Sequence, residues 1–356
     1  MTVTDSVPGR MLLMGTRGSA LARTQTQQVA DQLSDWLPGV EITSQIIRTE
    51  GDVTTGSLAS LGGTGVFAAA LRTAVVQGQV DLAVHSLKDL PAIQPESLRI
   101  AAVPVRADPR DALCARDGMS LDELPAGARI GTGSPRRVAQ LLHYRPDLQP
   151  VDIRGNVATR LARVVGYEHH HDNAPAAAGS DRGDLDAVIL ACAGLDRVDM
   201  DWAITERLDP SVMLPAPGQA ALAVEVSTTR LLGSAVEDAL AQLNDPATLL
   251  QVTAERAVLA RLEAGCAAPV GALATVDARS GTLALQAMVA GMDGVNLIRA
   301  NRSVPVCVDG DQLIDDDRSR ADAWQLGMAV AEELLDSGAE LLPEAPPRGN
   351  GGSSLS

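Results

Sequence analysis

Residues 80–91, Val-Asp-Leu-Ala-Val-His-Ser-Leu-Lys-Asp-Leu-Pro, are the stretch around which the predicted fold is built. The first half alternates small and branched apolar residues, a pattern typical of a short buried strand. The second half places His85, Ser86, Lys88 and Asp89 just beyond the carboxyl end of that strand, the edge where open α/β sheets bind ligands. Lys88 is also the only lysine in the chain. The stretch predicts a ligand-binding edge, and the alternative is a turn carboxylate beside a solvated lysine.

The size and composition of the chain favour packed globular domains. The chain has 356 residues, 46% of them hydrophobic, and a single core stops growing near roughly 250–300 residues, so we expect about two or three domains. A net charge of −16 and an aromatic content of 2% argue against binding to nucleic acid or to anionic membranes. The longest apolar run, residues 187–195, is shorter than the roughly 20 residues that span a bilayer. Residues 1–5 lack the basic region of a signal peptide, and four widely spaced cysteines favour a reduced protein, so we expect a cytoplasmic location.

Arginines recur where a predicted strand passes into a predicted helix. Arg17 lies between a strand at 11–14 and a helix at 20–37, and Ser19 is the expected N-cap of that helix. Anions bind at such helix starts because the first backbone N–H groups have no partner within the helix. The sequence therefore predicts an anion site at Arg17, and the alternative is an ordinary surface arginine.

A second turn of this kind carries two consecutive arginines. Ser134 is the expected N-cap, Pro135 suits the first helical position, and Arg136 and Arg137 follow. Two cations in a first turn oppose the helix dipole, and no acid lies nearby in the sequence. We therefore expect an external anion there.

A third turn, Arg154-Gly155-Asn156, leads into a helix that carries Arg160. The planar fork of arginine suits carboxylates, because it can donate two parallel hydrogen bonds. The alternative is an arginine-rich surface helix.

Three further features concern loops. A long polar loop at 50–65 is either a lid or a disordered segment. Phe67, the only phenylalanine, follows it either as a core residue or as a ring facing a ligand. His169–His171 lie in a segment of small residues that we expect to be a surface insertion without a metal. Cys266 lies on a loop of a small third domain, where it is either a small buried thiol or a covalent attachment point.

Six motifs together make the chain resemble the porphobilinogen deaminase (hydroxymethylbilane synthase) family. They occur in family order over roughly residues 10–335. They are Gly-Thr-Arg-Gly-Ser-Ala-Leu-Ala at 15–22, Gly-Gly-Thr-Gly-Val-Phe at 62–67, Ala-Val-His-Ser-Leu-Lys-Asp-Leu-Pro at 83–91, Gly-Thr-Gly-Ser-Pro-Arg-Arg at 131–137, Arg-Gly-Asn-Val-Ala-Thr-Arg-Leu at 154–161 and Leu-Glu-Ala-Gly-Cys-Ala-Ala-Pro-Val-Gly at 262–271.

The resemblance implies an α/β fold with two lobes like those of periplasmic binding proteins, an active-site cleft between them and a small α+β C-terminal domain. The expected boundaries are 10–104 with 219–238 for the first lobe, 105–216 for the second, 242–342 for the C-terminal domain, and disordered tails at 1–9 and 343–356.

The resemblance also implies a transferase of haem biosynthesis that deaminates four porphobilinogen molecules and condenses them head to tail into hydroxymethylbilane. Asp89 is implied as the catalytic carboxylate, and Cys266 as the residue that carries a dipyrromethane cofactor through a thioether. We expect a cytoplasmic monomer without metal, nucleic-acid or membrane partners. The implied cofactor contacts are Lys88, Ser134, Arg136, Arg137, Arg154 and Gly155, and the implied substrate contacts are Arg17, Ser19, Phe67, Arg154, Arg160 and Arg197.

The sequence departs from the family at the lid, where Thr64, Ala69 and Ala70 stand in places that commonly hold lysines. A two-lobed carboxylate-binding protein without catalysis would explain the arginines equally well, but it would not explain Cys266 on a third domain. A hydrolase using Cys266 and His85 lacks a third residue to orient the histidine.

Overall fold

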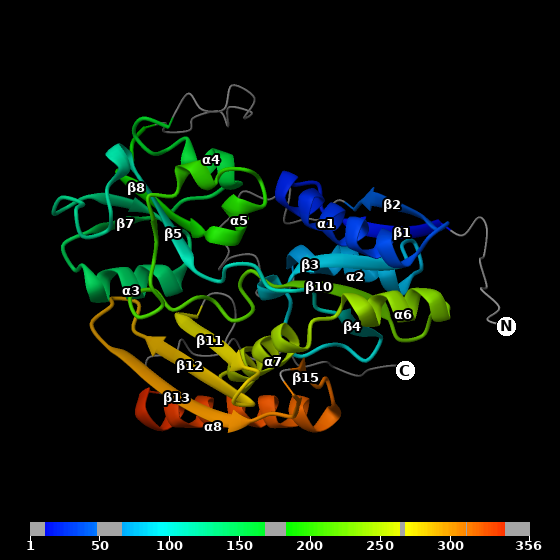
Figure 1. Cartoon of the computed structure of the whole chain (residues 1–356). Coiled ribbons are helices and arrows are strands. Elements are labelled where there is room, and N and C mark those ends of the chain that lie inside the picture. The colour runs from blue at the N-terminus through cyan, green and yellow to red at the C-terminus, as the bar shows by residue number, and fades with distance from the viewer. Residues whose placement is uncertain (1–10, 48–65, 168–182, 264–267, 311, 339–356) are drawn as a thin grey trace, which may run out of the picture.

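The protein consists of two sheet-based lobes and a C-terminal α+β unit (Figure 1). The computed structural model describes residues 11–47, 66–167, 183–263, 268–310 and 312–338. Both expected tails, the loop at 50–65 and the histidine run lie outside these ranges. The predicted α/β class with two lobes is confirmed.

The first lobe is built on a five-stranded sheet. Its strands and helices are β1 (Met11–Thr16), β2 (Glu41–Ile46), β3 (Leu82–Ser86), β4 (Leu98–Ala102), β10 (Leu222–Ser227), α1 (Ala20–Trp36), α2 (Val66–Val76) and α6 (Ser234–Leu243). The strand order is β2-β1-β3-β10-β4, in which β1 pairs in parallel with β2 and β3, and β10 runs antiparallel to both of its neighbours. A strand from late in the chain therefore completes the first sheet.

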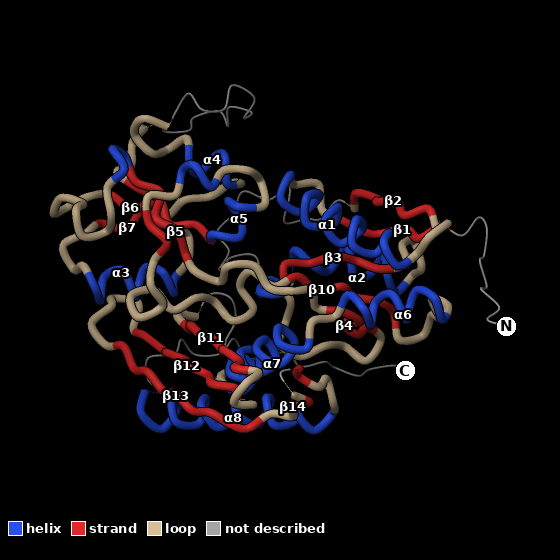
Figure 2. Tube along the Cα trace, viewed as in Figure 1, coloured by secondary structure: helices blue, strands red, loops and turns tan. Residues whose placement is uncertain are grey.

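The second lobe repeats this plan. Its elements are β5 (Asp111–Ala115), β6 (Arg129–Gly131), β7 (Gln149–Val151), β8 (Ala187–Ala191), β9 (Glu206–Arg207), α3 (Pro135–Tyr144), α4 (Val157–Leu161) and α5 (Cys192–Asp196). The order is β7-β6-β8-β5-β9, again with three parallel strands and an antiparallel fourth. Two chain segments, 103–110 and 208–221, join the lobes and run as loops between the two sheets (Figure 2).

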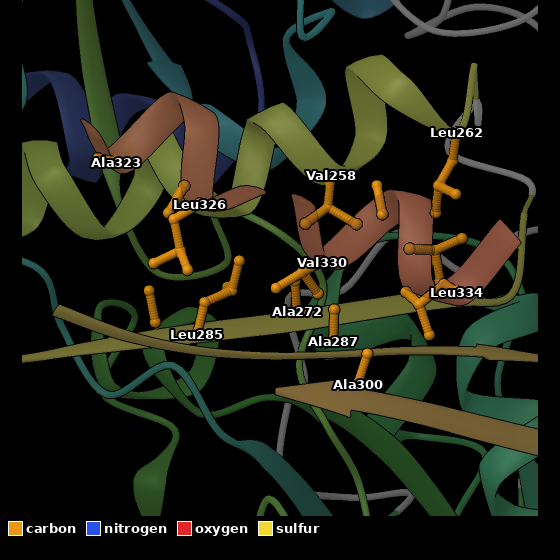
Figure 3. Packing of buried hydrophobic residues seen from close by; sticks show 14 of the residues in the cluster. Val258, Leu262, Ala272, Leu285, Ala287, Ala300, Ala323, Leu326, Val330 and Leu334 are labelled. Atoms are coloured by element: carbon orange, nitrogen blue, oxygen red, sulfur yellow. The ribbon is translucent and has the colours of Figure 1, made fainter. Parts of the chain in front are cut away.

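The C-terminal unit packs two long helices against one face of a three-stranded antiparallel sheet. Its elements are α7 (Pro246–Arg261), β11 (Val270–Asp277), β12 (Thr282–Ala290), β13 (Leu297–Pro305), β14 (Val308–Asp309), β15 (Gln312–Leu313) and α8 (Asp317–Gly338). Figure 3 shows Val258 of α7 and Val330 of α8 meeting above Ala272 and Ala287 of the sheet. Alanines on the strands let the larger helix side chains fill the layer between them.

β3 is apolar on both sides because helices cover both faces of its sheet. Leu82 and Val84 pack with α1 and α6, whereas Ala83 packs with α2. Such strands appear in the sequence as short continuous apolar runs. Among the described helices, none is both long and apolar enough to cross a membrane.

Candidate functional site

The predicted turn lies at the end of β3, and this strand reaches two residues further along the chain than the sequence suggested. His85 and Ser86 belong to the strand, because they pair with Ala223 and Leu222 of β10. The expectation that they lie beyond the strand end is therefore wrong. Lys88 and Asp89 do lie beyond it, in the 3-10 helix η3 (Leu87–Asp89).

A pocket opens beside this turn, and Asp89 shares it with Arg17. Arg17 comes from the junction of β1 and α1, where Ser19 caps the helix as predicted by accepting a hydrogen bond from Ala22 N at 3.3 Å. Gln25 of α1 contributes too, and its side chain exchanges hydrogen bonds with Ser86 Oγ. The lining residues are Arg17, Ala22, Gln25, Ala68, Val84, His85, Ser86 and Asp89.

Lys88 extends from the same turn toward the second lobe. Its Nζ donates a hydrogen bond to Gln219 Oε1 at 3.2 Å. Burial of the ammonium lowers the pKa of Lys88 to about 8, against an opposing effect of Asp89. The charges of Arg137 and Arg136 contribute to this lowered pKa. The first-lobe turn and the start of α3 in the second lobe therefore lie within electrostatic range of each other.

Arg136 and Arg137 share one buried carboxylate, Asp111 at the start of β5. Arg136 Nη2 lies 2.7 Å from Asp111 Oδ2, and Arg137 Nη2 donates to Asp111 Oδ1 at 2.7 Å. Burial alone would raise the pKa of Asp111, but the two guanidiniums outweigh it and hold the pKa at about 2. The two arginines therefore have an internal acidic partner that is distant in the sequence, and the expected external anion stays a prediction. Ser134 is the N-cap residue of α3, although its side chain makes no capping hydrogen bond.

Sequence reasoning missed Asp111 because it lies 26 residues from Arg137 in the chain. One signal was present: an acid opens the apolar run Asp111–Ala115, and all five of its residues are buried. A carboxylate inside a buried strand needs a partner. Gln219 was missed as well, although it joins the two lobes: its Nε2 donates to Asp111 Oδ1 at 2.9 Å while its Oε1 accepts from Lys88.

The third arginine turn, at residues 154–160, lies within electrostatic range of Arg137. Burial, together with the charges of Arg137 and Arg154, lowers the pKa of Arg160 to about 10. Arg160 Nε donates to Gly155 O at 2.8 Å. Gly155 has a φ of +104°, which favours glycine, and a Cβ there would lie 2.9 Å from Thr159 Cγ2. The turn thus depends on glycine to present its two arginines.

Arg197 lies apart from this group. It follows α5, donates from Nη2 to Ala220 O at 2.7 Å, and its pKa is lowered to about 10 by burial, with Asp196 opposing the shift. Two further predicted residues cannot be placed. Cys266 lies outside the described residues, and of Phe67 only the backbone, in α2, is described.

The residues present fit the dipyrromethane group that the resemblance implies. Two rings, each with an acetate and a propionate, need several cationic donors. Lys88, Arg136, Arg137, Arg154 and Arg160 supply five positive charges, whereas the acids that act on them are Asp89, Asp111 and Asp152. Within the described part of the chain, Arg136 Nε is buried and makes no hydrogen bond. An unused buried donor in a cationic cluster suits an anionic ligand.

Comparison with known proteins gives a consistent result. The family model described as "Porphobilinogen deaminase, dipyromethane cofactor binding domain" matches residues 12–231, and "Porphobilinogen deaminase, C-terminal domain" matches residues 249–336. A porphobilinogen deaminase of Micrococcus luteus is 59% identical, with 93% of this chain and 94% of that protein covered. That of Cutibacterium acnes is 51% identical (92% and 95% covered), and that of Thermobifida fusca 44% (98% and 100%).

Among solved structures, a TRAP periplasmic solute binding protein from Desulfovibrio salexigens is 13% identical, with a TM-score of 0.37 and coverage of 66% of this chain and 72% of that one. The family models and the curated relatives span both lobes and the C-terminal unit. The chain therefore belongs to the porphobilinogen deaminase family of enzymes.

Proposed function

We propose that this chain deaminates porphobilinogen and joins four molecules head to tail into hydroxymethylbilane, with Asp89 as the catalytic carboxylate. The observation that carries the proposal is the position of the η3 turn. Asp89 shares a pocket with Arg17, while its neighbour Lys88 lies within electrostatic range of Arg136 and Arg137 of the other lobe. A carboxylate is thus surrounded by groups that bind carboxylates. A non-catalytic carboxylate-binding protein is not favoured, because the chain belongs to an enzyme family.

Asp89 has a direct chemical task in this reaction. Loss of ammonia from porphobilinogen leaves a cationic azafulvene, which a fixed carboxylate stabilises. The same carboxylate can accept and return the pyrrole N–H proton, since it lies at the wall of the pocket that the ring would enter. The reaction is a substitution in which a carbon–carbon bond replaces the bond to ammonia, so no oxidant is required.

The remaining residues bind and orient. Bidentate guanidinium contacts would hold the acetate and propionate groups of each ring. When bound, the dipyrromethane group supplies the free pyrrole carbon on which the chain grows. We assign cofactor contacts to Lys88, Ser134, Arg136, Arg137, Arg154 and Gly155, covalent attachment to Cys266, and substrate contacts to Arg17, Ser19, Phe67, Arg154, Arg160 and Arg197.

We also propose that the protein is a monomer of the cytoplasm, with the domain limits 10–104 with 219–238, 105–216 and 242–342. Membership of β10 in the first sheet supports a discontinuous first lobe. Three described cysteines, Cys114, Cys192 and Cys307, are free thiols, which supports a reducing compartment.

Two variants test the assignment. Asp89→Asn should keep the attached group, as judged by intact mass, and lose roughly 10²–10³-fold in kcat. Asp322→Asn, on α8 far along the chain, is the control and should retain the activity. Cys266→Ala should lack the mass of two pyrrole units that wild-type protein carries. Near-normal turnover of Asp89→Asn would refute the catalytic role, and an unmodified mass of active wild-type protein would refute the attachment.

A further inference from the structure

An arginine of the C-terminal unit donates hydrogen bonds to backbone carbonyls of the segment that carries Lys88 and Asp89. Arg256, on α7, is 7% exposed. Its Nη2 donates to Pro91 O at 2.6 Å and to Ala92 O at 3.1 Å, and its Nη1 lies 3.4 Å from both Leu87 O and Leu90 O. All four acceptors come from one short segment, 87–92, which brackets Asp89.

These contacts are the principal polar interactions of a buried cation. The acid whose charge acts on Arg256 is Glu225, and that carboxylate is already engaged by Arg72 at 2.8 Å and by His85 at 3.2 Å. Burial lowers the pKa of Arg256 to about 10, so the guanidinium remains charged at neutral pH. A buried charge that points at neutral carbonyls is costly unless all of its donors are used. The planar fork of arginine can reach two pairs of carbonyls at once, which an ammonium cannot.

Other contacts of the turn are the burial of Leu87 and Leu90 and a few hydrogen bonds. η3 is a single turn, closed by Leu90 N donating to Leu87 O at 3.1 Å. On the opposite side, Leu87 N donates to Ala221 O at 3.0 Å in the segment that leads into β10. Without Arg256, Leu90 O and Ala92 O would lose the donors that the guanidinium supplies. Leu87 O would keep Leu90 N, and Pro91 O would keep Gln94 Nε2. Part of the hydrogen bonding on both sides of Asp89 therefore depends on Arg256.

We infer that Arg256 is a positioning residue, which fixes the Lys88–Asp89 turn in its working geometry from the neighbouring domain. The inference rests on the proposed role of Asp89. Catalytic groups must be held closely in place, and a displacement of about 1 Å can cost as much as 100-fold in rate. Arg256 does not line the pocket beside Asp89. Its loss should therefore lower kcat and leave substrate binding by the arginines unchanged.

The experiment compares Arg256→Met, Arg256→Lys and the control Arg261→Met in the full-length, cofactor-loaded protein. Arg261 lies on the same helix, and its ion pair with Glu332 joins side chains that are 36% and 51% exposed. We expect Arg256→Met to lose roughly 10- to 100-fold in kcat, with KM for porphobilinogen unchanged within about twofold. Arg256→Lys, which keeps the charge but not the fork, should recover part of the loss, and Arg261→Met should match wild type.

A kcat equal to that of Arg261→Met would overturn the inference, as would a rise in KM at constant kcat. If Arg256→Met fails to fold, Arg256→Lys decides: an intermediate kcat supports the inference, and a wild-type kcat refutes it. Asp89→Asn is measured in parallel. An active Asp89→Asn enzyme would refute the proposed function, whereas an inactive Asp89→Asn beside a fully active Arg256→Met refutes only the positioning role.

Discussion

Replacing Glu255 by glutamine should destabilise the junction of all three structural units. Glu255 is fully buried on α7, and each of its carboxylate oxygens accepts two hydrogen bonds. Oε1 receives Arg106 Nη1 at 2.6 Å and Ala274 N at 2.9 Å, and Oε2 receives Arg106 Nη2 at 2.9 Å and Gly218 N at 2.7 Å. Arg106 and Gly218 lie on the two segments that join the lobes, and Ala274 lies on β11.

The magnitude follows from this count of donors. A glutamine side chain presents one NH₂ group where the carboxylate has an oxygen, so two of the four donors would face another donor. Each unsatisfied buried group costs about 1–3 kcal/mol, and the Arg106 guanidinium, 6% exposed, loses its counter-charge. Breaking a buried pair from one side costs about 3–5 kcal/mol. At roughly 2 °C per kcal/mol for a large domain, the melting temperature should fall by about 6–10 °C.

The assay is thermal unfolding of cofactor-loaded protein, with Glu332→Gln as the matched control. Glu332 pairs with Arg261 near the surface, and exposed pairs contribute about 0–1 kcal/mol. Adding Arg106→Met to Glu255→Gln should restore part of the lost stability, because no unpaired guanidinium then remains buried. If Glu255→Gln melts within a degree or two of Glu332→Gln, the buried-pair reasoning is wrong.

Three further predictions concern single groups. The pKa of Asp111 is held at about 2, below the ordinary 3.8. The stabilising effect of its charge is therefore complete above about pH 4 and is lost as the pH falls toward 2. When the free energy of unfolding is measured over that interval, wild type should lose about 2 kcal/mol more than Asp111→Asn. In Cys266→Ser protein labelled with ε-¹³C lysine, the single lysine signal should titrate near pH 8, and a value near the ordinary 10.5 would contradict the burial of Lys88. A Cβ on Gly294 (φ +72°) would lie 2.7 Å from Ala139 O and Leu142 Cβ, whereas a Cβ on Gly310 (φ +58°) would meet open space. The melting temperature should therefore fall further for Gly294→Ala than for Gly310→Ala. Equal falls would mean that backbone strain alone matters.

The features that could be predicted from sequence are those fixed by neighbouring residues. Ser19 caps α1 through a contact three residues away, and Pro135 starts α3 as its position suggests. The apolar run of β3 predicts a short buried strand without any knowledge of its partners. The arginine turns were found because a cation at a helix start conflicts with a local rule, and such conflicts concentrate at functional sites.

The features that could not be predicted depend on pairings far apart in the chain. His85 and Ser86 extend β3 only because β10 arrives more than 130 residues later to pair with them. Asp111 meets Arg137 because β5 places it beneath the start of α3, and Arg256 reaches the η3 turn across 165 residues of chain. No local sequence pattern indicates which of these distant residues will come into contact. Each unpredicted residue is a polar group whose partner is chosen by the packing of lobes, so burial identifies it only once the fold is known.

The choice of arginine over lysine follows from the same burial. Desolvation and neighbouring cations lower the pKa values of Arg160 and Arg256 to about 10, yet both side chains remain charged at neutral pH. The ordinary pKa of a lysine is about two units below that of an arginine. A similar environment would therefore bring the pKa of a lysine close to physiological pH, as it does for Lys88, whose pKa is about 8. A cluster of several buried cations is therefore more fully charged at neutral pH when its members are guanidiniums. Lys88, with a pKa of about 8, is the group of the described cluster that loses its charge closest to neutral pH. Its hydrogen bond to Gln219 links that loss of charge to the contact between the lobes.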